Sequence, residues 1–155
     1  RLMTEVVKKL KLNIQYFTEG RIKTVEIMRE NSPIQLLFLN DNPKVIDTMR
    51  GFFRVKLVSE KGFEVYDEES NHKINGEFGK KLKTLIGEIT ILPNESIASN
   101  LNKTIYIKVT PIMSVVEKYK NKIAIEVTGS TYRKNNVITL FLTDNIKEKA
   151  ATIVD

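Results

Sequence analysis

The chain has 155 residues, of which 41% are hydrophobic and 28% charged. This composition is typical of one folded domain with a single core, rather than of a disordered or membrane-spanning chain. The lack of cysteine excludes disulfides, thiolate-bound zinc, iron–sulfur clusters and a cysteine nucleophile, while the net charge of +6 favours polyanions without discriminating among them.

The first third of the chain alternates apolar and polar residues with a period of two, which predicts strands. Leu10, Leu12, Ile14 and Tyr16 lie on one face, and residues 18–21 contain a glycine for a turn before residues 22–29 return as a hairpin. Residues 34–39 are almost continuously apolar, which is typical of a central strand covered on both faces. Asn42-Pro43 then predicts the start of a short helix that Gly51 ends.

The middle of the chain predicts further strands. Residues 53–57 and 63–65 form a second hairpin, and the polar loop 67–72 follows. Residues 80–86 fit a helix or a strand equally well, residues 87–92 predict a strand, and residues 94–102 a loop with a helical turn. The clearest alternation lies in residues 104–110.

The last third predicts one more hairpin. Ser114 and Glu117 form a capping box for one or two helical turns through Tyr119. Residues 123–127 and 137–143 then read as paired strands, and residues 144–155 as a short helix or a disordered tail.

These elements predict a mainly β protein, an antiparallel β-sandwich or barrel built from hairpins with one to three short helices. We expect a single β-rich domain over residues 1–155, with roughly the first nine and the last eleven residues as candidates for flexible arms. An alternative boundary between residues 67 and 79 would divide it into two small halves.

Catalytic and metal-binding motifs are weak. The lone histidine, His72, follows the acidic residues Asp67, Glu68 and Glu69, a group that offers oxygen and nitrogen ligands but matches no metal-binding loop, so we interpret it as a solvated turn. No serine lies in a nucleophile elbow. We therefore expect no enzyme, no cofactor, no metal and no small-molecule substrate, although two dispersed carboxylates remain an alternative.

Basic residues concentrate in the last third of the chain. If residues 123–127 and 137–143 form a hairpin, its geometry gathers the candidate nucleic-acid-binding residues into one patch, with Tyr119 beside them: Lys118, Lys120, Lys122, Tyr132, Arg133 and Lys134. Such a patch would bind phosphates while bases stack on the tyrosines. The alternative is a solvated hairpin rim.

Residues 50–57 resemble the aromatic RNA-binding strand of RNA-recognition motifs. Arg50, Gly51, Phe52 and Val55 match, but Arg54 and Leu57 replace aromatic positions. A strand that faces the core after a helix end explains these residues better.

Residues 11–17, Lys-Leu-Asn-Ile-Gln-Tyr-Phe, resemble the opening stretch of virion structural proteins, chiefly capsid proteins, of tailed phages that infect Gram-positive bacteria. The resemblance covers seven residues and implies a virion component. An amphipathic strand explains the same residues.

Two hypotheses follow. The first is a non-enzymatic structural or assembly subunit, such as a virion capsid or tail component, that binds copies of itself or other protein subunits. The second is a nucleic-acid-binding module that uses the C-terminal basic patch. Since no signal peptide or membrane-spanning run is recognisable, we expect a cytoplasmic or virion location and no membrane partner.

Overall fold

A computed structural model of the chain describes residues 2–40, 42–67 and 72–129. Contacts divide the chain into two compact units. One unit is Ile14–Thr110, and the other combines Arg1–Asn13 with Pro111–Asp155.

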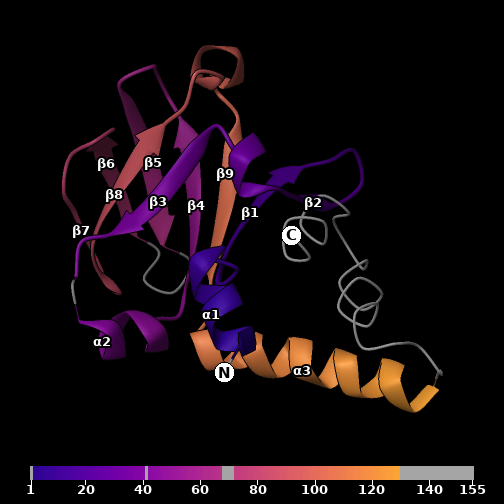
Figure 1. The fold of residues 1–155 in the computed structure, drawn as a ribbon. Helices are drawn as coiled ribbons and strands as arrows, with labels where there is room; N and C mark the ends of the chain where they lie inside the picture. The colour runs from indigo at the N-terminus through magenta and orange to yellow at the C-terminus, as the bar shows by residue number, and fades with distance from the viewer. Residues whose placement is uncertain (1, 41, 68–71, 130–155) are drawn as a thin grey trace. The chain divides into compact units, whose positions relative to one another are not determined.

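The unit Ile14–Thr110 contains two antiparallel sheets (Figure 1). The larger has six strands in the order β2-β1-β9-β4-β5-β6: β1 Ile14–Glu19, β2 Thr24–Ile27, β4 Gly51–Leu57, β5 Gly62–Asp67, β6 His72–Glu77 and β9 Thr104–Val109. The smaller has three strands in the order β3-β8-β7: β3 Ile34–Phe38, β7 Leu82–Thr84 and β8 Gly87–Pro93. Short helical segments connect them: η1 Arg29–Asn31, α2 Pro43–Thr48 and η2 Ile97–Asn100.

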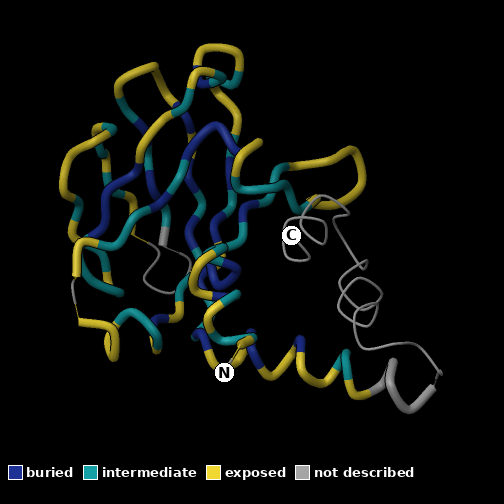
Figure 2. Tube along the Cα trace, viewed as in Figure 1, coloured by how far each residue is buried: buried dark blue, intermediate teal, exposed yellow. Residues whose placement is uncertain are grey.

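The two sheets share one hydrophobic core. Alternate residues of the central strands β4 and β9 are almost fully buried, and they contact buried residues of β3 and β8 in the same cluster. The buried positions lie along the strands, while many exposed positions lie in the connecting loops (Figure 2). The fold is therefore mainly β, with antiparallel sheets in a sandwich-like arrangement rather than a closed barrel, which confirms the predicted class.

Local sequence explains several of these elements. The Asn42 side chain accepts a hydrogen bond from the Lys44 N–H at 3.0 Å and caps α2, with Pro43 at its first position, as predicted. In β4 the side chains of Phe53, Val55 and Leu57 are buried, which confirms a core-facing strand over the stretch that resembles the RNA-binding motif. The ambiguous segment 80–86 contains strand β7.

The other unit contains two helices, α1 Leu2–Lys9 and α3 Ile112–Gly129. Their cluster of buried residues is centred on Val7 and Val116, both with no exposed surface. The first residues, considered as a flexible arm, thus form a helix with a buried side chain. The candidate arm at the other end lies outside the described residues.

The expectation of a strand over residues 123–127 was wrong, because these residues belong to α3. Ile112, Val116, Tyr119 and Ile123 recur every three to four residues and pack in the cluster with α1, a spacing that only a helix places on one side. Ser114 lies inside this helix and does not begin it. The expected partner strand, residues 137–143, and the tail 144–155 lie outside the described residues.

Two strand predictions also need correction. The first strand begins at Ile14 rather than Leu10, because Leu10 and Leu12 follow α1 and pack with its unit. Strand β3 is an edge strand of the smaller sheet and not a central one, with only Ile34 and Leu36 fully buried. A continuous apolar run indicates that a strand is buried, but it does not indicate whether the strand lies at the centre or at the edge of a sheet.

Candidate interaction surfaces

Strand β2 and the turn before it expose two large apolar side chains among polar ones. Gly20 N–H donates to the Lys23 carbonyl at 2.8 Å, which closes a two-residue turn of Arg21 and Ile22. A Cβ at Gly20 would lie 2.5 Å from that carbonyl oxygen, so the turn requires glycine. The Ile22 side chain is 98% exposed and Val25 is 49% exposed. Within the part of the chain that the structure describes, β2 pairs with β1 alone.

The edge of β3 differs from that of β2, because side-chain hydroxyls accept hydrogen bonds from two of its backbone N–H groups. The Leu36 N–H donates to the Tyr16 hydroxyl at 2.9 Å, and the Ile34 N–H is 3.4 Å from the Ser32 hydroxyl, which accepts. Both contacts are buried, and the Tyr16 contact joins the two sheets. Burial raises the pKa of the Tyr16 phenol, against the smaller lowering effects of the Leu36 N–H and the Arg29 charge.

The outer face of the six-stranded sheet carries a band of aromatic and basic residues. The register places five residues in one row across five strands: Phe17, Tyr106, Arg54, Tyr66 and Lys73. The Phe52 and Tyr106 rings stack with centroids 6.0 Å apart, and the Arg54 guanidinium lies 4.7 Å from the centre of the Tyr66 ring. The sequence showed Phe52 only as a partial motif match, because Tyr106, the ring that it stacks against, comes from a distant segment of the chain.

Charges on this face are unevenly distributed. The outward positions of the central strands β4 and β9 carry Arg54, Lys56 and Lys108. Carboxylates lie on the flanking strands, where Glu64 forms an ion pair with Lys73 at 2.8 Å and Glu19 accepts a hydrogen bond from Tyr106 at 2.7 Å. The hydrogen bond to Glu64 raises the pKa of Lys73. The middle of the face is therefore basic and its flanks are partly neutralised.

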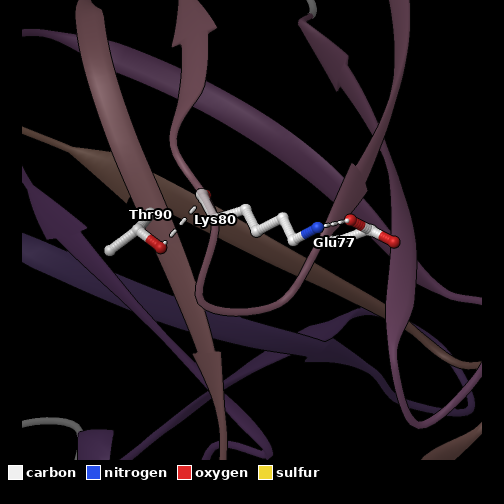
Figure 3. A network of polar contacts seen from close by, with 3 residues as sticks. All are labelled: Glu77, Lys80 and Thr90. Atoms are coloured by element: carbon white, nitrogen blue, oxygen red, sulfur yellow. Dashed lines mark hydrogen bonds and ion pairs between the residues drawn. The ribbon is translucent and has the colours of Figure 1, made fainter.

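The turn after β6 connects the larger sheet to the smaller one through a polar network (Figure 3). The Thr90 hydroxyl donates to the Lys80 carbonyl at 3.1 Å, and the Lys80 ammonium lies 2.7 Å from the Glu77 carboxylate. The hydrogen bond between these charged groups lowers the pKa of Glu77 and raises that of Lys80. The ion pair between Glu77 and Lys80 therefore accounts for the shifted pKa values of both residues, and no ligand is needed to explain them.

The predicted basic patch is only partly within the described residues. Lys118, Lys120 and Lys122 lie on α3, where a helix turns by about 100° per residue, so Lys120 projects away from the other two. Tyr119 is buried, and the Lys122 ammonium lies 5.9 Å from the centre of its ring, so this tyrosine offers no open stacking surface. Tyr132, Arg133 and Lys134 lie outside the described residues.

The acidic group around His72 is also incomplete. Asp67 and His72 are paired across β5 and β6, and Glu68 and Glu69 lie outside the described residues. Among described residues, no three metal-binding side chains cluster. An open cleft of about 330 Å³ lies beside His72, between the core-facing side of the larger sheet and β7; its lining is Phe53, Val65, His72, Ile74, Lys83, Thr84 and Leu85.

Comparison with protein-family models and with curated proteins finds no match to this chain. None of the helices in the described residues is long and apolar enough to cross a membrane.

Proposed function

We propose that this protein is a non-enzymatic assembly subunit that acts through protein–protein contacts. The observation that carries the proposal is the pair of exposed apolar side chains Ile22 and Val25, which lie at and beside β2, the end strand of the six-stranded sheet that the described residues form. The contrast with β3, whose edge is closed by Tyr16 and Ser32, supports a selective role for β2.

The proposal leaves the kind of assembly open. Residues 11–17 resemble virion proteins, but Ile14 and Tyr16 are core residues of β1 and Leu12 packs in the helical unit. Packing therefore explains the apolar residues of this stretch. A virion subunit is one form of assembly subunit, and the proposal does not depend on it.

Light scattering coupled to size-exclusion chromatography tests the proposal. We expect a concentration-dependent multimer that persists in high salt, because burial of apolar surface is little affected by screening. A monomer at every protein concentration and at both salt concentrations would contradict self-assembly.

Nucleic-acid binding is a second candidate function, favoured by the aromatic and basic face over β4 and β9. Rings of Phe52 and Tyr106 offer stacking surface, and three cations on the same strands offer phosphate contacts. This surface differs from the C-terminal patch predicted from sequence.

Fluorescence anisotropy with a labelled single-stranded oligonucleotide tests this second candidate. If the sheet face binds, Phe52→Ala with Tyr106→Ala should weaken binding by about tenfold or more, since each stacked base contributes about 1–3 kcal/mol. The matched control is Lys118→Ala with Lys120→Ala on α3, which should have the larger effect only if the C-terminal patch binds. Absence of salt-dependent binding would exclude both sites.

A further inference from the structure

The strand register places two exposed lysines on the same face as the stacked rings of Phe52 and Tyr106. Lys108 lies directly opposite Phe52 across β4 and β9. Lys56 lies four residues further along β4 and therefore faces the same side, about 13 Å from Phe52. Rings and cations thus share one small surface at the centre of the six-stranded sheet.

The two rings are not part of the hydrophobic core among the described residues. The core cluster contains the alternate residues Phe53 and Ile107, which point to the opposite side of the sheet. Phe52 and Tyr106 are intermediate in exposure, so part of each ring remains on the surface. Their centroids lie 6.0 Å apart and the ring planes differ by 26°, which makes them a stacked pair to which a further flat ring can be added.

The charges of this surface favour an anionic partner. The outward positions of the two central strands hold three cations and no carboxylate: Phe52, Arg54, Lys56, Thr104, Tyr106 and Lys108. The flanking carboxylates contact other groups, since Glu64 pairs with Lys73 and Glu19 accepts from the Tyr106 hydroxyl. A polyanion that also carries flat rings is therefore complementary to this surface, and nucleic acid has both properties.

The form of the nucleic acid follows from the rings. In a duplex each base is paired and stacked within the helix, so a protein reaches only phosphates and the base edges in the grooves. An aromatic side chain on a sheet can stack on a base only where that base is unpaired. The lysines alone would bind either form, whereas Phe52 and Tyr106 add binding energy for a single strand.

We infer that the outward face of β4 and β9 binds single-stranded nucleic acid in preference to a duplex, with an unpaired base added to the stack at Phe52 and phosphates at Lys56 and Lys108. The inference rests on the second candidate function and names its substrate class and its contacts.

A tryptophan in the stack tests the base contact directly, because the chain has no tryptophan of its own. Phe52→Trp keeps a flat ring at this position and gives one fluorophore that a stacked base quenches. We expect its emission to fall when a single-stranded oligonucleotide is added. The matched control is Leu92→Trp, a 38% exposed position on the smaller sheet, whose emission should not change.

The two lysines are tested by salt dependence. Lys56→Gln with Lys108→Gln should weaken single-strand binding in fluorescence anisotropy and reduce the slope of log affinity against log salt by about 1.4, since each phosphate contact contributes about 0.7. The control is Lys81→Gln with Lys83→Gln, which removes the same charge from two exposed residues at the smaller sheet and should leave the slope unchanged. Circular dichroism checks that every variant keeps the parent fold.

Two competitors test the preference for a single strand. A duplex of the same length and a polyglutamate peptide of equal charge should each displace the labelled single strand at least about tenfold less well than the unlabelled single strand does, because neither offers unpaired bases.

The outcomes separate this inference from the function on which it rests. If nucleic acid binds but the duplex competes equally well, or the emission of Phe52→Trp does not fall, the stacking site is wrong and nucleic-acid binding stands. Polyglutamate that competes as well as the single strand would assign this face to an acidic protein and overturn the inference. Absence of binding by any oligonucleotide would overturn both.

Discussion

The hydroxyl of Tyr16 carries the hydrogen bond that joins β1 to the edge of β3. Tyr16→Phe keeps the ring and leaves the buried Leu36 N–H without its acceptor, which we expect to lower the free energy of unfolding by about 1–3 kcal/mol. Urea unfolding measures the change. Tyr106→Phe, which loses a more exposed hydrogen bond to Glu19, should have a smaller effect.

Tyr16 also predicts a pH dependence. Its pKa is raised above the ordinary value of 10.0, so the folded state holds the phenolic proton more tightly than the unfolded state. The contribution to stability is therefore complete below pH 10 and is lost as the pH rises from there through the folded-state pKa. The alkaline loss of stability should be smaller in Tyr16→Phe, and equal losses in the two proteins would contradict this assignment.

Gly76 lies opposite Phe63 across β5 and β6, and a Cβ there would lie 2.5 Å from the Phe63 ring. Phe63 is buried against Phe78, with ring centroids 5.1 Å apart, so the ring has little room to move. Gly76→Ala should therefore destabilise the unit by about 1–3 kcal/mol in urea unfolding. Asn75→Ala, an exposed position on the same strand, should change it by less than about 0.5 kcal/mol.

Helices α1 and α3 stabilise each other through fully buried valines, and the short α1 would be marginal alone. Val116→Ala removes two buried methyl groups and should cost about 2 kcal/mol. Hydrogen exchange should then accelerate at amides of both helices. The control is Lys120→Ala, an exposed residue of α3, which should not accelerate exchange because alanine favours the helix; exchange as fast in this variant as in Val116→Ala would contradict the role of packing.

Prediction of individual elements succeeded where the signal was local. The N-cap of α2, the hairpin turn at Gly20 and the alternation in β9 each depend on a few neighbouring residues, whereas the predicted end of α2 at Gly51 was wrong, because the helix ends at Thr48 and Gly51 begins β4. It failed at residues 123–127, where an alternating stretch continues a helix whose apolar face starts at Ile112. Packing against α1 outweighs the local preference of β-branched residues for strands.

The buried core of the unit Ile14–Thr110 is formed entirely by residues of that unit. We therefore expect a fragment of residues 14–110 to fold alone, with a β-type circular dichroism spectrum and one cooperative thermal transition. A fragment that melts without cooperativity would show that its stability requires the rest of the chain.

The candidate surfaces could be predicted only in part. Positive charge and a partial aromatic motif were visible in the sequence, but the row from Phe17 to Lys73 unites five strands that are far apart along the chain. The edge position of β2 depends on strand order, which no local pattern encodes. The described lysines of the predicted patch lie on a helix instead of a hairpin, so spacing two residues apart no longer places them together.

The sequence by itself determined the mainly β class, the antiparallel hairpins and the lack of thiol chemistry, because alternation, turn residues and composition are local properties. Tertiary structure decided which strands lie at edges, which helix the C-terminal residues join and which side chains meet on the sheet face. These depend on contacts between residues far apart in sequence, whose free energy comes from burial in a shared core rather than from the preferences of neighbouring residues.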